Sequence, residues 1–157
     1  MKARTPTLIS IAILTTLIMG AIFLQSMAQT TALPINVVFD PKSYTWDGLP
    51  SPTWNAEIWR QKVQDRADYS TIKLENTYSP SATPSPALHG PRLVVPFNGE
   101  DVKAALAAKI PIDHMGIMVP GTYKVYLLVS GNLKAEFGGT AFEGTGLLTV
   151  TVPPPPP

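Results

Sequence analysis

The chain has no cysteine among its 157 residues. This absence excludes disulfide bonds, thiolate metal sites and anchoring through a lipid-modified cysteine. A domain of this size can bury a sufficient core without covalent cross-links. A cysteine-free chain that is held by packing alone is more natural for a bacterial or archaeal envelope protein than for a small extracellular animal domain.

Charge and histidine are also scarce. Charged residues make up 15% of the chain, and no basic block or stripe occurs. Lys2 and Arg4 are two of the 12 basic residues. The other ten lie beyond residue 28 and nearly balance the 11 acidic residues there, so this part of the chain is almost neutral. Nucleic-acid binding therefore lacks its electrostatic basis. The two histidines, His89 and His114, do not have the spacing of a known metal motif, and we expect no metal site.

The polar residues show no catalytic constellation. Asp65 and Asp68 are expected to solvate a loop, and Asp101, next to Glu100, to help cap a helix. Ser130–Gly131 and Gly144–Gly146 resemble fragments of nucleophile or phosphate loops, but neither a G-x-S-x-G elbow nor a Walker pattern is present. We interpret them as turn residues, and we predict that the protein is not an enzyme and uses no cofactor.

The N-terminal segment has the three parts of a secretory signal. Lys2 and Arg4 are followed by a largely apolar run from Leu8 to Leu24, and Ser26 and Ala28 form a small-residue cleavage site before Gln29. Residues 1–28 are thus expected to be a signal peptide. The apolar run also reaches the lower limit for spanning a bilayer, so an uncleaved anchor over residues 7–28 is the alternative. Both interpretations place the rest of the chain in the extracellular space or cell envelope.

The remainder has the alternation typical of half-buried strands, most clearly at residues 123–129 and 145–152. Shorter strands are predicted at residues 35–39, 53–59, 71–75 and 93–97, and one short helix near residues 98–109, with Asn98 as N-cap. We predict one all-β domain over residues 29–152, an antiparallel Ig-like or jelly-roll-like sandwich of about seven strands. Residues 153–157 are expected to be a polyproline tail or the start of a linker.

The connections are predicted from turn-forming residues. For residues 60–69 a helical turn is the alternative, but we interpret them as a loop that crosses between the sheets. Residues 76–91 are expected to be an extended surface loop. Gly131–Asn132 has the composition of a hairpin turn. Pro96 indicates that its strand lies at a sheet edge or ends there.

Several short motifs together resemble a β-sandwich module that recurs in secreted and cell-surface proteins of archaea and bacteria. Its opening "DP-x-(S/T)-L", its "(V/I)-S-T-I-x-L" strand, its "L-x-V-x-F" strand with a short helix, and its closing "T-F-E-G-x-D-x-I-x-V" strand have counterparts here. These counterparts are Phe39–Ser43, Tyr69–Leu74, Arg92–Asn98 and Ala141–Val152. The resemblance implies architecture and a surface location, with no activity attached.

The chain departs from that family at one place. Family members often carry an Asp/Asn-rich segment before the "L-x-V-x-F" strand, which looks able to hold calcium. The matching segment here, Ser79–Pro91, has no acidic residue. Since calcium needs several converging oxygen ligands, the resemblance does not extend to a calcium site.

We therefore predict a non-enzymatic structural or adhesive module of a prokaryotic cell surface, whose partners are other surface proteins or itself. One alternative is carbohydrate binding through exposed aromatic side chains. Period two places Trp54 inside, which leaves Trp46, Trp59 and Tyr44 as candidate ligand-binding residues. Another alternative is a subunit of a surface fibre that donates residues 30–39 to a neighbouring chain.

Overall fold

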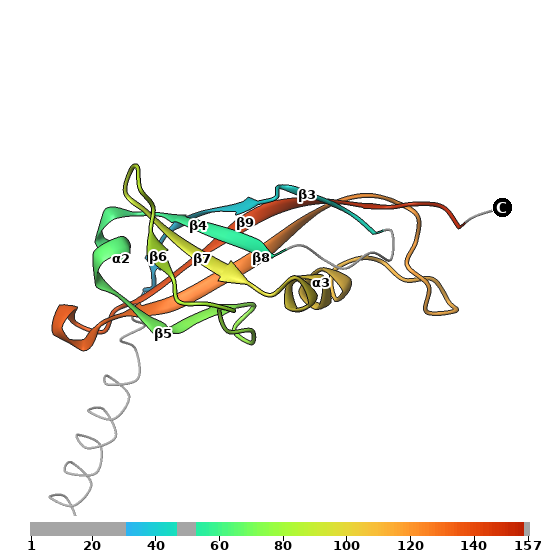
Figure 1. Cartoon of the computed structure of the whole chain (residues 1–157). Coiled ribbons are helices and arrows are strands. Elements are labelled where there is room, and N and C mark those ends of the chain that lie inside the picture. The colour runs from blue at the N-terminus through green and yellow to red at the C-terminus, as the bar shows by residue number, and fades with distance from the viewer. Residues whose placement is uncertain (1–30, 47–52, 156–157) are drawn as a thin grey trace, which may run out of the picture. The chain divides into compact units, whose positions relative to one another are not determined.

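The computed structural model describes residues 31–46 and 53–155, which form two sheets with few helices (Figure 1). Sheet A has the order β1-β9-β8-β5, with β3 also paired to β9, and sheet B has the order β2-β4-β7-β6. The prediction of a mainly β, two-sheet architecture is confirmed. The prediction of a wholly antiparallel fold is wrong, because β1 and β3 run parallel to β9. Nine strands are present in the described residues, more than predicted, since the N-terminal strand is divided into three.

In the described part of the chain, two short α-helices and one 3-10 helix connect the strands. Their bounds are α2 Gln61–Arg66, α3 Gly99–Ala107 and η1 Ala135–Phe137. The strands are β1 Leu33–Pro34, β2 Asn36–Asp40, β3 Ser43–Thr45, β4 Trp54–Trp59, β5 Ala67–Leu74, β6 Ser85–Pro86, β7 Arg92–Phe97, β8 Gly121–Leu133 and β9 Ala141–Val152.

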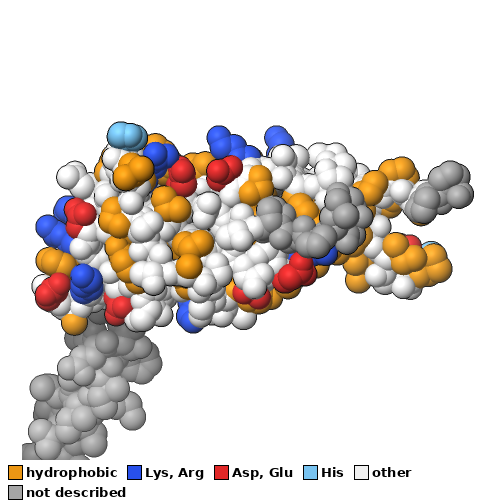
Figure 2. Space-filling model, viewed as in Figure 1, with side chains coloured by type: hydrophobic (Ala, Val, Ile, Leu, Met, Phe, Trp, Pro, Cys, Tyr) orange, Lys and Arg blue, Asp and Glu red, His pale blue; other side chains and the backbone are white. Residues whose placement is uncertain are grey.

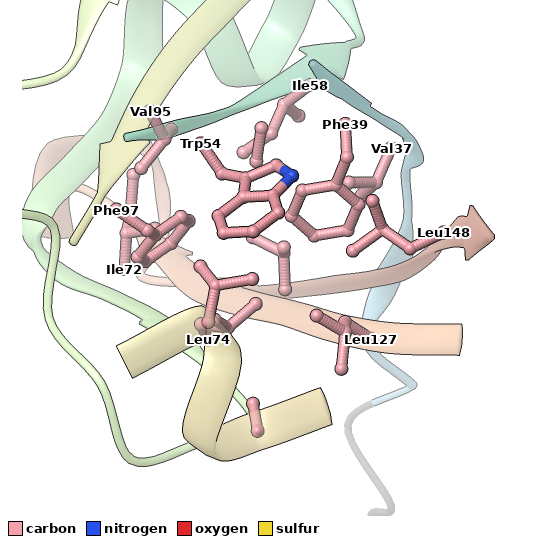
Figure 3. Close-up of a cluster of buried hydrophobic side chains, with 14 of the residues drawn as sticks. Val37, Phe39, Trp54, Ile58, Ile72, Leu74, Val95, Phe97, Leu127 and Leu148 are labelled. Carbon is pink, nitrogen blue, oxygen red and sulfur yellow. The ribbon is translucent and has the colours of Figure 1, made fainter. Parts of the chain in front are cut away.

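Every second residue of the facing strands fills a single core between the sheets. Trp54 is fully buried near its centre, and its indole Nε1 donates a hydrogen bond of 2.9 Å to the carbonyl of Pro41. Each large side chain buried in this way contributes about 1.5–3 kcal/mol to folding. Figure 3 shows the side chains that meet from the two sheets: Val37, Phe39, Trp54, Ile58, Val95 and Phe97 from sheet B, and Ile72, Leu74, Leu127 and Leu148 from sheet A.

The first strand changes sheets as it crosses the domain. Leu33 pairs with Phe142 of sheet A, β2 then joins sheet B beside β4, and β3 returns to β9 at Thr149. The crossing requires close contact with β9. A Cβ atom at Gly144 would lie 2.2 Å from the carbonyl oxygen of Ile35. Because only glycine leaves room for this backbone, β1 and β2 can pack directly over β9.

Two predicted turns are in fact strand interiors. Gly144 and Gly146 belong to β9, and Gly131–Asn132 belongs to β8. A Cβ atom at Gly131 would lie 2.6 Å from the ring of Phe142, so this glycine makes room for the ring on the opposite strand. The β8–β9 connection lies further along, at residues 134–140, where Gly138 and Gly139 have φ angles of 89° and 60°.

The prediction of a loop over residues 60–69 is correct about the crossing between the sheets and wrong about its structure. Six of these residues form α2, and β5 begins at Ala67. The helix is fixed by Val63, which is fully buried. A single apolar anchor in a short helix produces no periodic pattern, which explains why the sequence favoured a loop over the helical turn.

The predictions for Pro96 and for the short helix agree better with the structure. Strand β7 is interior to sheet B, but β6 pairs only with its residues Leu93 and Val94. Pro96 lies one residue before the end of β7, which agrees with the second of the two predicted options. Helix α3 begins after Asn98, whose side chain accepts a hydrogen bond of 2.9 Å from the backbone N–H of Glu100. Its inner face buries Val102, Ala105 and Leu106.

The predicted export segment, residues 1–28, lies outside the described residues. Within residues 31–46 and 53–155, no helix has the length and apolar character that a membrane crossing requires.

Candidate binding surface at the proline end

The two ends of the β8–β9 hairpin define two ends of the domain. We call the end with residues 134–140 the hairpin end, and the end where Pro153–Pro155 leave β9 the proline end (Figure 1). Twelve residues of β9 at about 3.3 Å per residue separate these ends. The candidate surface lies at the proline end.

A structured loop over residues 111–119, here called the apolar loop, extends from the proline end. The carboxylate oxygen Oδ1 of Asp113 accepts hydrogen bonds from the backbone N–H groups of Met115 and Ile117, at 2.8 and 2.9 Å. Gly116 has a φ angle of 80°, which glycine adopts without strain. These bonds hold the loop in the described conformation.

The apolar loop presents side chains that the core does not cover. Ile112, Met115 and Ile117 are 62%, 68% and 59% exposed, and Val119 is 37% exposed. Figure 2 shows hydrophobic side chains gathered at this end of the domain. Single exposed apolar residues need no explanation, but a contiguous group on a rigid loop is typical of an interaction site.

A groove of about 660 Å³ separates the apolar loop from the prolines that follow β9. This volume lies within the range of about 300–1,000 Å³ found for ligand sites. Asp113 supplies the charged side chain of its wall. The groove is lined by Trp46, Asp113, Met115, Ile117, Met118, Pro120, Val152, Pro153, Pro154 and Pro155.

Several backbone N–H groups around the groove are already bonded or absent. The N–H groups of Met115 and Ile117 bond to Asp113, the N–H of Val119 bonds to the carbonyl of Pro111, and the four prolines have no N–H. The carboxylate of Asp113 is the charged acceptor of the lining, and the indole N–H of Trp46 is a side-chain donor. An occupant that matches this surface is apolar and carries hydrogen-bond donors, ideally with a positive charge.

The three candidate aromatic residues do not form one platform. Trp46 is half-buried and lines the groove at the proline end, where its backbone N–H bonds to Thr151. Trp59 is 40% exposed on the outer face of sheet B, and its strand partner Asn36 places it toward the hairpin end. Period two correctly placed Trp54 and Trp59 on opposite faces.

Tyr44 is a core residue, only 9% exposed. Its ring meets Trp46 and Trp54 edge-on, with centroid separations of 5.7 and 5.3 Å. Its hydroxyl is buried and has no hydrogen-bond partner among the described residues. Tyr44 therefore supports Trp46 from below and presents no face to a ligand.

Positive charges cover the two tryptophans in part. The Lys103 Nζ lies 5.5 Å from the ring centroid of Trp46, and the Arg92 guanidinium lies 4.8 Å from that of Trp59. Arg92 also pairs with both carboxylate oxygens of Glu57, at 3.0 and 3.1 Å. One face of the Trp59 ring is thus covered by Arg92 of the same sheet.

The remaining candidates are dispersed. His89 and His114 are exposed in separate loops, and Asp68 caps a turn by accepting hydrogen bonds from Ser70. No group of three or more His, Asp or Glu side chains within the described residues is placed to hold a metal ion. Residues 33–40, most of the predicted donor strand, are paired inside their own domain, with Ile35, Val37 and Phe39 buried.

Sequence reasoning missed the apolar loop. The available signal was a group of apolar residues at 112, 115, 117, 118 and 119 around a glycine, in a segment without helical or strand periodicity. The chain matches no protein-family model, no curated protein and no solved structure.

Proposed function

We propose that this protein is a non-enzymatic structural module of a prokaryotic cell surface, exported by residues 1–28 and built as an immunoglobulin-like sandwich. If β1–β3 count as one interrupted first strand, the domain has seven strands, which can be lettered A to G in chain order. Sheet B (β2-β4-β7-β6) then has the order A-B-E-D, and sheet A (β1-β9-β8-β5) has the order A-G-F-C. This arrangement matches the ABED and CFG sheets of immunoglobulin domains. It supports that option over a jelly roll.

The observation that carries the proposal is how the chain enters and leaves the domain. Leu33 enters beside Phe142 at the start of β9, and the chain leaves after Val152 at its end. The first and last strands run parallel, joined at both ends of β9. Three backbone hydrogen bonds between the first and last strands are Ile35 N–H to Glu143 O at 2.9 Å, Thr149 N–H to Lys42 O at 3.0 Å and Trp46 N–H to Thr151 O at 2.7 Å.

This geometry resists tension. When two parallel strands are pulled from opposite ends, they slide along each other, and the bonds between them are loaded together. When they are pulled from the same end, the bonds break one after another. The described domain has the first arrangement, which suits a spacer that transmits force between its neighbours on a surface.

Single-molecule force spectroscopy tests this proposal. Because the chain has no cysteine, handles attach uniquely to introduced ones. Ala32→Cys with Pro155→Cys loads β1 and β3 against β9 in shear. Thr45→Cys with Pro155→Cys pulls from one end, because Thr45 pairs with Thr151. We expect a rupture force several times higher in the first geometry, and equal forces would contradict the proposed role.

Carbohydrate binding is a second candidate, favoured by one observation. Trp46 and Asp113 line the same groove, and an indole face beside a carboxylate is a common way to hold a sugar ring and its hydroxyls. Glycan-array binding that is lost in Trp46→Ala and retained in Trp59→Ala, with both variants folded, would support it. Absence of binding to any glycan would remove it.

A further inference from the structure

The hairpin end carries a feature whose chemistry is complementary to the groove. Phe137 is 39% exposed in the turn between β8 and β9, and the Arg66 guanidinium stacks 4.8 Å above its ring centroid. The backbone N–H of Lys134 donates a hydrogen bond of 2.8 Å to the carbonyl of Arg66. This bond ties the turn to the end of α2, so the ring and the guanidinium form one projecting unit, here called the Phe137 knob.

The guanidinium of the knob and the carboxylate of the groove are outside the ion pairs of the described residues. Within residues 31–46 and 53–155, the ion pairs are Arg92–Glu57 and Lys109–Glu75. Neither Arg66 nor Asp113 takes part in them. Two acidic side chains, Asp65 and Glu136, lie near the knob in sequence, and Lys103 lies beside Trp46, so the complementarity is local to the two features rather than general to the two ends.

We propose that the groove at the proline end of one copy receives the Phe137 knob of a second copy. The phenyl ring would pack against Met115, Ile117 and the prolines, and the Arg66 guanidinium would meet the carboxylate of Asp113. Arginine fits a surface of this kind, because it brings five N–H donors to a groove whose one charged side chain is the carboxylate of Asp113. The two features lie at opposite ends of the β8–β9 hairpin, so one copy can use both at once.

Such a contact is heterologous, since different surfaces of the two copies meet. Each added copy leaves a free groove at one end of the assembly and a free knob at the other. The contact therefore builds an open linear assembly unless the rotation between copies closes it into a ring. This inference goes beyond the spacer function, which a monomer would perform equally well.

Site-directed cross-linking of the full chain in detergent tests the contact, with cysteines placed beside the two features rather than in them. His114→Cys lies on the apolar loop, and Ala135→Cys lies two residues before Phe137; both positions are exposed. Chains carrying one cysteine each, with tags of different size, are mixed and treated with a short flexible bismaleimide. We expect the mixed His114→Cys/Ala135→Cys product to exceed either like–like product several-fold.

Two further variants make the result decisive. Leu88→Cys, which is 96% exposed in the loop before β7, measures random collision. Adding Phe137→Asp to the Ala135→Cys chain should reduce the mixed product to that level, while circular dichroism verifies the fold. A mixed product no greater than the Leu88→Cys control would overturn the proposal, and so would a dominant like–like product, which indicates a symmetric contact. Either outcome leaves the force experiment unaffected.

Discussion

Three glycines of the β8–β9 hairpin are positions where a neighbouring group occupies the space of a side chain. At Gly131 and Gly146 the neighbours are aromatic rings, of Phe142 and Phe39, and at Gly144 the neighbour is the backbone of Ile35. A ring can turn slightly to accept a methyl group, whereas the backbone of Ile35 is held against β9 by the hydrogen bond from its N–H to the carbonyl of Glu143. The three positions are therefore not equivalent.

We expect Gly144→Ala to destabilise the domain most. Overpacking in a core costs about 1–3 kcal/mol, and the rigid obstacle puts Gly144→Ala at or above the upper end of that range. Gly146→Ala should fall within it. Urea denaturation followed by circular dichroism measures both changes, with Thr145→Ala on the exposed face as the control. A Gly144→Ala variant as stable as the control would show that the first strand does not cross β9 here.

Glu75 connects three elements through one side chain. Its carboxylate oxygen Oε1 accepts a hydrogen bond of 2.7 Å from the backbone N–H of Leu128 in β8, and lies 3.0 Å from Lys109 Nζ after α3. Glu75 itself has a φ angle of 50°, in the left-handed region. The backbone bond and the ion pair make different contributions to stability, which two variants separate.

Glu75→Ala is expected to lower the free energy of unfolding by about 1–3 kcal/mol, because the N–H of Leu128 loses its acceptor. Lys109→Ala should lower it by less than about 1 kcal/mol, because the pair is partly exposed and screened by solvent. Thermal denaturation of the two variants compares these effects. Equal losses would show that the ion pair, and not the backbone bond, holds this corner.

At the scale of elements, alternation predicted most strands and which residues face inward. Trp54, Ala56 and Ile58, and likewise Val125, Leu127 and Val129, are buried as period two requires. The errors have separate physical causes. Glycine in a long strand was interpreted as a turn because its packing role depends on a partner that is distant in sequence. The parallel pairing of β1 and β3 is invisible for the same reason.

The candidate site was only partly predictable. Trp46 was selected from a cluster of aromatic residues and does line the groove, but Tyr44, two residues before it, shares its side of the strand and lies deeper in the core. The apolar loop has no periodicity to reveal it. Its exposure follows from how Asp113 folds the loop back on itself, and this depends on hydrogen bonds rather than on hydropathy.

Helix α3 provides a prediction at this scale. Asn98→Ala removes the acceptor of the Glu100 N–H and should cost about 1 kcal/mol of stability. Asn98→Asp keeps an acceptor at the same position and is expected to be nearly neutral, since Glu100 and Asp101 already place negative charge in the first turn. Chemical denaturation of the pair checks this. Equal destabilisation by both substitutions would exclude capping as the cause.

For the whole molecule, one shared core predicts one cooperative transition. Residues of both sheets meet around Trp54, and no disulfide holds either sheet on its own. Trp54 fluorescence, with Trp46 and Trp59 replaced by phenylalanine, and far-UV circular dichroism should therefore give the same midpoint in urea. Two distinct midpoints would mean that the sheets unfold separately, and the first strand would then lose its role as the link between them.

The division of the first strand between the two sheets has a consequence for biogenesis. Both β1 and β3 need β9 as their partner, and β9 is the last strand of the domain to be synthesised. Such pairings span most of the domain, and folds with a high contact order form slowly. A ribosome-bound or partly translocated chain therefore lacks the strand that completes sheet A. Under the proposal that residues 1–28 direct export, the chain would remain incompletely folded during translocation, and it would gain its final stability only after β9 has crossed the membrane.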